Sequence, residues 1–363
     1  MSVLIISKKK GLVSVPMSNN TKPFLADAAI IRPILIVLLV LYHAFAIFTG
    51  GWKPLDSFPD LKVYWWLGRG SEAFMLESFV FVSGYVFGFQ SINRGGALNA
   101  KPLLWSKFKR LIIPCLLFGF LYIILFEDIT QPWTITVYEL LNGVGHLWFL
   151  PMLFWCFVLI WIIESFHFKP YLVLPVLLLC SIGSFITLPF QFARSLYYMF
   201  FFYVGFLLQK EHVSLDGFYN SRNLLLLVVT FLVLFPFLTI LRERAIIILQ
   251  DSSILMKIVY SILANLCKFI YSSVGLTMLL VIVGTALKTT PQQLPGWVIK
   301  LGGYCMGVYI FQQFFLKYLY YHTSLPAILG PWLLPWCGFV ITLVVSLLIT
   351  LLFKQTRLGR QII

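Results

Sequence analysis

Long apolar runs recur along nearly the whole chain, and only short polar segments separate them. Of the 363 residues, 60% are hydrophobic and 11% are charged, whereas a soluble domain is normally about 25% charged. An alternating barrel pattern is absent, so helices are the only structure in which this backbone satisfies its hydrogen bonds inside lipid. We therefore predict an all-α, polytopic integral membrane protein with no room for a second soluble domain.

The apolar runs predict about ten transmembrane helices with both termini in the cytoplasm. We expect these helices at about 29–49, 74–92, 111–126, 147–166, 171–189, 194–209, 223–241, 258–286, 302–320 and 331–353. In this orientation 18 of the 27 Lys and Arg residues lie on the cytoplasmic side, which agrees with the positive-inside rule. The expected domains are a cytoplasmic tail over 1–26, a transmembrane domain over 27–356 and a short cytoplasmic tail over 357–363.

Several functional classes are excluded by the composition. The net charge of +14 mostly reflects the topological bias, and no aromatic-interleaved basic patch indicates nucleic-acid binding. All six cysteines lie in apolar segments, where they are typical of small buried hydrophobes and not of disulfides. The spacing of Cys and His predicts no metal site. No P-loop or Gly-x-Ser-x-Gly motif is present, and no internal repeat is evident, which weighs against common transporter architectures.

The first helix carries two polar groups on one face. Arg32 and His43 are eleven positions apart, which returns to within about 20° of the same direction and separates them by roughly 16 Å along the axis. Ionisable groups inside a membrane are functional candidates by default. His43 is either a general base for a hydroxyl or a hydrogen-bonded interior histidine. Arg32 either faces an anionic cytosolic ligand or is an ordinary positive-inside anchor.

Glu77 lies at nearly the same predicted depth as His43. A carboxylate in apolar surroundings either pairs or takes up a proton. Its partner is His43 or His146 if it orients an imidazole, and Lys268 or Arg69 if the pairing is structural.

The segment Lys107-Phe-Lys-Arg110 opens the third predicted helix on the cytoplasmic side. It is either a stop-transfer flank or a phosphate clamp, because Lys and Arg supply charge-assisted donors at close spacing.

Further polar residues lie in the fourth, eighth and ninth predicted helices. His146 and Trp148 open the fourth helix, as interfacial belt residues or as part of a site. Lys268 lies well inside the bilayer and requires a counter-charge or a wet cavity. Gln312 and Gln313 either line the same cavity or join helices.

In these motifs the chain resembles the acyltransferase 3 family of membrane-bound acyltransferases. The Arg32/His43 spacing is similar to that of the family's first helix, and Phe79-Val-Phe-Val-Ser-Gly-Tyr85 resembles the motif of its second. Lys107-Phe-Lys-Arg110 resembles the family's Arg-x-x-Arg, with one lysine for an arginine. Gly145-His-Leu-Trp-Phe-Leu150 matches its His-Leu-Trp-Phe stretch. Tyr309-Ile-Phe-Gln312 departs from the pattern, because the family commonly has His in place of Gln312.

The resemblance implies about ten helices that move an acyl group, most often acetyl, from cytosolic acyl-CoA to a hydroxyl of a bacterial glycan. We expect His43 to act as general base or transient acyl carrier, with Glu77 holding its tautomer. The expected binding residues are Arg32, Lys107, Lys109 and Arg110 for acyl-CoA, and His146, Trp148, Lys268 and Gln312 for the acceptor. Acetyl-CoA is then a co-substrate, no cofactor is permanently bound, and the protein lies in a bacterial cytoplasmic membrane.

Two alternatives share these features. A transporter or flippase of lipid-linked sugars also needs buried charges and a cavity. The same scaffold could instead transfer succinyl or another acyl group. The acceptor hydroxyl and the oligomeric state have no signature in the sequence.

Overall fold

The computed structural model describes residues 25–93, 99–127, 132–184, 188–249, 253–289 and 294–363. The structure is 86% helical, and these described residues contain no strand. The all-α prediction is therefore confirmed. The predicted tail over 1–26 lies almost entirely outside the described residues.

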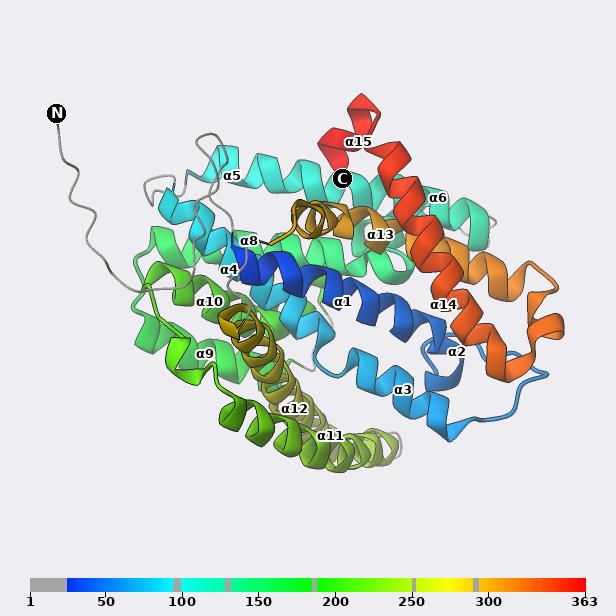
Figure 1. The fold of residues 1–363 in the computed structure, drawn as a ribbon, viewed down its shortest axis with the longest axis horizontal. Helices are drawn as coiled ribbons and strands as arrows, with labels where there is room; N and C mark the ends of the chain where they lie inside the picture. The colour runs from blue at the N-terminus through cyan, green and yellow to red at the C-terminus, as the bar shows by residue number, and fades with distance from the viewer. Residues whose placement is uncertain (1–24, 94–98, 128–131, 185–187, 250–252, 290–293) are drawn as a thin grey trace.

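The helices follow one another along the chain with short connections (Figure 1). Their bounds are α1 (Ala26–Ala44), α2 (Ala46–Thr49), α3 (Lys62–Glu72), α4 (Met75–Asn93), α5 (Ala100–Lys107), η1 (Phe108–Ile112), α6 (Ile113–Phe126), α7 (Trp133–Asn142), η2 (Gly145–Trp148), α8 (Phe149–Ser165), α9 (Pro170–Gly183), η3 (Pro189–Gln191), α10 (Phe192–Lys210), η4 (Asp216–Phe218), α11 (Ser221–Leu249), α12 (Ile254–Thr289), α13 (Gly296–Tyr321), α14 (Leu325–Phe353) and α15 (Arg357–Ile362). Here η1 is a π-helical turn, and η2, η3 and η4 are 3₁₀ turns.

A helix occupies each of the ten predicted places, and seven helical stretches of the described chain are long and apolar enough to cross a membrane. These stretches are Ala26–Ala44, Lys62–Asn93, Ala100–Phe126, Gly145–Ser165, Ser221–Ile248, Ile254–Thr289 and Leu325–Phe353. The protein is an integral membrane protein. The number of ten spans and the side on which the termini lie stay predictions.

The first helix, α1, is the centre of the bundle. It packs against α3, α4, α12, α13 and α14. Figure 1 shows α1 crossing the middle of the molecule, with α11 and α12 at one edge and α5 and α6 at the opposite edge. Leu35, Val40 and Ala44 are completely buried along it. Any polar group on α1 is therefore held inside protein and away from lipid.

The helices α4 and α10 approach each other most closely at glycines. A Cβ atom on Gly84 would lie 2.0 Å from the carbonyl oxygen of Phe202, and one on Gly205 would lie 2.3 Å from that of Phe81. Small residues at such a crossing let two backbones approach within contact distance, which is the usual way that membrane helices gain packing energy. This contact explains the glycine of the Ser83-Gly84-Tyr85 motif.

Four helices were not predicted from the sequence. They are α3, α5, α7 and α15, of which α5 extends the third predicted helix backwards to Ala100. The first helix, α1, begins at Ala26, slightly before the predicted start, and contains Pro33 in its interior.

We predict that Gly84→Ala destabilises the protein, because the new methyl group would overlap the Phe202 carbonyl oxygen. Overpacking of this kind costs about 1–3 kcal/mol or more. The thermal unfolding temperature of the purified protein in detergent measures the effect.

The matched control is Gly183→Ala at the end of α9, where a Cβ atom would meet nothing within 4 Å. Equal unfolding temperatures for the two variants would contradict the close α4–α10 contact.

Candidate active site

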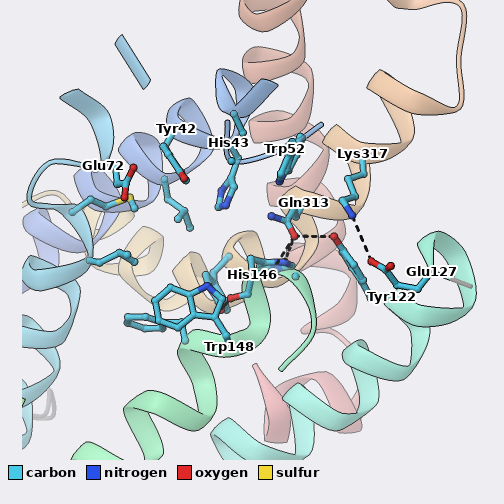
Figure 2. A pocket seen from close by; sticks show the side chains of 18 residues that line it. Tyr42, His43, Trp52, Glu72, Tyr122, Glu127, His146, Trp148, Gln313 and Lys317 are labelled. Carbon is cyan, nitrogen blue, oxygen red and sulfur yellow. Dashed lines mark hydrogen bonds and ion pairs between the residues drawn. The ribbon is translucent and has the colours of Figure 1, made fainter. Parts of the chain in front are cut away.

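A cavity of about 320 Å³ lies beside the last turn of α1 (Figure 2). Its walls come from α1, the segment after α2, the junction of α3 and α4, the end of α6, η2 and α13. Pockets that bind small molecules have volumes of about 300–1,000 Å³, so this one is at the lower end of that range. The polar side chains that line it include His43, Glu72, Glu127, His146, Gln313 and Lys317.

His43 contributes its imidazole to this cavity from α1. The residue is only 7% exposed. Its ring stacks on Trp52 with centroids 5.9 Å apart, and lies 6.3 Å from the ring of His146. Its Nδ1 atom is enclosed by protein and has no hydrogen-bond partner among the residues that the structure describes. Its Nε2 atom makes no hydrogen bond within these residues and is not enclosed, so Nε2 is the nitrogen available to a bound molecule.

The turn η2 presents His146 because two glycines allow its backbone path. Gly143 has a φ of 80° and Gly145 a φ of 57°, a region that side chains other than glycine rarely occupy. A Cβ atom on Gly145 would also lie 2.7 Å from the ring of Tyr122 and 2.8 Å from Oε1 of Gln313. The Gly-His-Leu-Trp motif therefore encodes a tight turn that faces α6 and α13.

Both ring nitrogens of His146 are engaged by α13. Nε2 lies 3.0 Å from the carbonyl oxygen of Ile310, and Nδ1 lies 2.8 Å from Oε1 of Gln313. The backbone N–H of His146 donates to the same Oε1, and the hydroxyl of Tyr309 donates to the carbonyl oxygen of His146. His146 is thus fixed in place, whereas His43 keeps a nitrogen free for chemistry.

Gln313 also accepts a hydrogen bond of 3.2 Å from the Tyr122 hydroxyl. Beside it, Lys317 forms an ion pair of 3.8 Å with Glu127 at the cavity wall. Gln312, predicted to bind the acceptor, does not line the cavity. It is completely buried, and neither amide atom has a partner in the described chain. One residue of offset turns a helical side chain by about 100°, so Gln313 takes the expected place of Gln312.

The predicted orienting role of Glu77 is corrected by its contacts. Glu77 is completely buried, and its Oε1 atom lies 3.4 Å from Nζ of Lys268. The Tyr197 hydroxyl donates to the same oxygen over 3.2 Å. Glu77 is absent from the cavity lining that contains His43. The structural pairing with Lys268 is therefore the one observed.

Of the other two residues predicted to bind the acceptor, one lines the cavity and one does not. Trp148 lines the cavity, and the Arg194 guanidinium lies 4.3 Å from the centre of its ring. Lys268 does not line the cavity, because its ammonium is taken up by Glu77 and by the hydroxyl of Tyr198 at 3.5 Å.

A second cluster of polar groups lies near the Arg32 end of α1. Arg32 is within electrostatic range of Arg110 and of the Cys305 thiol. Lys354, just after α14, is near the same two residues and donates to the carbonyl oxygen of Gly303. Burial lowers the pKa of the Lys354 ammonium, and the positive charge of Arg110 acts in the same direction. This cluster is a place where an anion would be stabilised.

The π-helical turn η1 carries Lys109 and Arg110, and such turns are frequent at functional sites. Lys109 is exposed and lies 5.7 Å from the ring centre of Trp105. The Lys107 ammonium instead lies 3.9 Å from the ring centre of Phe157, away from solvent. Of the four residues predicted to bind acyl-CoA, the structure brings Arg32 and Arg110 together.

Sequence reasoning missed Trp52, Tyr122 and Lys354. Trp52 lies in a connecting segment without a motif, and Tyr122 is one aromatic residue among many in an apolar helix. Lys354 was counted only as a topological charge. Tyr122 and Lys354 are far in the chain from Gln313 and Arg110, and Trp52 lies outside the helix of His43, so only the tertiary fold identifies these three residues. All six cysteines are free, as predicted. No group of three or more His, Cys, Asp or Glu residues in the described ranges could hold a metal ion.

These features define a helical membrane protein with a buried histidine cavity at one end of α1 and a separate cationic cluster near its other end. The profile of the acyltransferase 3 family, described as an acyltransferase domain, matches residues 27–352, nearly the whole chain. The chain belongs to this family and is a membrane acyltransferase. No curated protein and no solved structure matches it significantly.

We predict that Gln313→Leu lowers the thermal unfolding temperature of the purified protein. The variant leaves the His146 ring, its backbone N–H and the Tyr122 hydroxyl without their shared acceptor, and a buried polar group without a partner costs about 1–3 kcal/mol.

The neighbouring Gln312→Leu is the matched control. It removes an amide that has no partner among the described residues, so we expect an unchanged or raised unfolding temperature. The opposite order of the two variants would show that the network around His146 is assigned wrongly.

Proposed function

We propose that the protein transfers an acetyl group from cytosolic acetyl-CoA to a hydroxyl of a cell-envelope or exported polysaccharide. The observation that carries this proposal is that one buried helix, α1, carries both the His43 imidazole, which has a nitrogen without a partner, and Arg32, which belongs to a cationic cluster. Donor phosphates would bind at Arg32 and the thioester would react at His43. The proposal also takes the membrane to be a bacterial cytoplasmic membrane and both termini to be cytoplasmic.

The cationic cluster supports an anionic donor. Arg32, Arg110 and Lys354 come from three separate parts of the chain, and Arg110 lies within electrostatic range of the other two. Phosphate oxygens accept charge-assisted hydrogen bonds from such groups, and these bonds are about twice as strong as neutral ones. An incoming coenzyme A would bring phosphates to this cluster.

The length of α1 supports a donor that reaches from one cluster to the other. Arg32 and His43 are eleven positions apart on this helix, which corresponds to roughly 16 Å along the axis. A pantetheine arm is long and flexible, so its thioester could reach the cavity while the phosphates stay at the cluster. The glycan would then enter the cavity from the opposite side of the membrane.

The unpaired nitrogen of His43 supports the role of general base. In the proposed reaction the imidazole takes the proton of the acceptor hydroxyl as its oxygen attacks the thioester carbonyl. The new C–O ester bond forms, the C–S bond breaks, and the proton passes from His43 to the departing thiolate of coenzyme A. Transient acylation of the same imidazole is the variant of this scheme in which His43 is the first acceptor.

We predict that His43→Ala lowers acetyl transfer by about 10²- to 10⁴-fold, the usual contribution of a general base. Mass spectrometry of envelope glycans, from cells that lack the native protein and express each variant, measures the loss. The control is His167→Ala, because His167 is exposed after α8 and does not line the cavity. Full acetylation by a correctly folded and inserted His43→Ala variant would contradict the role of His43 as general base.

We predict that Arg32→Ala and Arg110→Ala each raise the KM for acetyl-CoA by about 10- to 100-fold, because a hydrogen bond to a charged group contributes about 1.5–3 kcal/mol. Lys101→Ala is the control, since Lys101 is an exposed cation in α5. Steady-state kinetics with varied acetyl-CoA measures the change. A larger effect on the acceptor than on acetyl-CoA would count against the phosphate clamp.

A further inference from the structure

Tyr42 lies next to His43 in the chain and lines the same cavity. The two rings are 5.0 Å apart between centroids and are inclined by 59°. Figure 2 shows the Tyr42 hydroxyl and the His43 ring directed to the same side of α1, into the cavity. Consecutive side chains of a helix point about 100° apart, yet the cavity is lined by both Tyr42 and His43.

The Tyr42 hydroxyl makes no hydrogen bond within the chain that the structure describes, and its oxygen is not sealed off from the cavity. A phenol hydroxyl in a protein interior normally finds a partner. A donor that faces a cavity without a protein acceptor is therefore available to a ligand.

Figure 2 shows two labelled carboxylates in the cavity wall, Glu72 and Glu127, and Glu72 is the one on the same side as Tyr42. This carboxylate is already paired, because its Oε2 atom lies 3.5 Å from the guanidinium of Arg69. The same guanidinium reaches Glu243 at 3.1 Å, which ties α3 to α11. Glu72 thus has an ionic partner in Arg69 and makes no hydrogen bond with the Tyr42 hydroxyl.

Gly51 leaves the space that the hydroxyl occupies. A Cβ atom at Gly51 would lie 3.1 Å from the Tyr42 hydroxyl oxygen and 3.5 Å from the hydroxyl oxygen of Thr49. The first of these distances is tighter than an ordinary contact, so a side chain at this position would push the hydroxyl out of place. The segment after α2 therefore fixes the direction of Tyr42 and also supplies Trp52, which stacks on His43.

We propose that Tyr42 is a catalytic residue whose hydroxyl donates a hydrogen bond to the acyl carbonyl oxygen during transfer. This inference rests on the proposed function and adds the group that stabilises the negative charge. When the acceptor oxygen bonds to the thioester carbon, the carbonyl electron pair moves to its oxygen. The Tyr42 hydroxyl stabilises that oxyanion while His43 holds the acceptor proton. Collapse of the intermediate restores the C=O bond and breaks the C–S bond. The proton then passes from His43 to the thiolate of coenzyme A.

Preorganised donors of this kind are worth more in a water-poor cavity than in water, and removing one typically lowers the rate about 10²- to 10³-fold. Their effect is made in the transition state, so it changes kcat and leaves the KM for the substrate nearly unchanged. A purely structural tyrosine would not produce this separation.

The test compares wild type with Tyr42→Phe, which keeps the ring and removes only the hydroxyl. The full-length protein is assayed in bacterial membrane vesicles with radiolabelled acetyl-CoA, and the readout is base-labile acetyl ester on envelope glycan. We expect kcat to fall about 10²- to 10³-fold, with the KM for acetyl-CoA and the thermal unfolding temperature unchanged.

Tyr64→Phe is the matched control. The Tyr64 hydroxyl donates to the carbonyl oxygen of Trp332 and does not line the cavity. A wild-type kcat in Tyr42→Phe would overturn the inference. So would equal losses in both variants, because they would point to a structural effect.

The variant His43→Ala shows whether a negative result concerns only the role of Tyr42 or the proposed transferase function as a whole. If His43→Ala abolishes transfer and Tyr42→Phe does not, the transferase scheme stands and the role of Tyr42 falls. If wild type and His43→Ala label glycan equally, the scheme fails and the role of Tyr42 fails with it.

Discussion

The burial of α1 is the constraint on which the rest of the structure depends. Five helices pack around it, so a polar group on its buried face must be accommodated by protein or by a ligand. A hydrocarbon environment makes an unpaired polar atom expensive. Near one end of α1, Arg32 lies within electrostatic range of another cation, Arg110. Near the other end, the His43 imidazole meets aromatic rings and an open cavity. Arg32 and His43 can therefore each interact with a bound molecule near their own end of α1.

The polar groups around α1 fall into two kinds. Glu77 and His146 are held by close partners on neighbouring helices, Lys268 and Gln313 respectively. These contacts join α4 to α12 and η2 to α13, so they fix the walls of the cavity. His43 keeps a nitrogen without a partner in the described chain. Glu77 and His146 thus help to build the site, whereas His43 lines the cavity with a free nitrogen and is the residue proposed to do its chemistry.

Most of the helical plan could be predicted from the sequence, because a membrane span requires a long apolar run. The short helices α3 and α7 could not, since they are only 11 and 10 residues long and contain more polar residues. For the site, the sequence predicted what helix geometry determines and did not predict what packing determines. The spacing on one helix placed Arg32 and His43, because an α-helix has a fixed rise and rotation. Depth alone misassigned Glu77, since depth gives the height of a side chain and not its direction around the axis. The choice between Gln312 and Gln313 depended on a rotation of about 100° that only packing defines.

The central claim is that donor and acceptor reach the His43 cavity from opposite faces of the membrane. Radiolabelled acetyl-CoA, which does not cross a lipid bilayer, supplied to sealed membrane vesicles of defined orientation tests it most directly. The account predicts that glycan becomes labelled in inside-out vesicles, in which the cytoplasmic face is outside, and not in intact right-side-out vesicles. Equal labelling of both preparations, or labelling only of right-side-out vesicles, would contradict it.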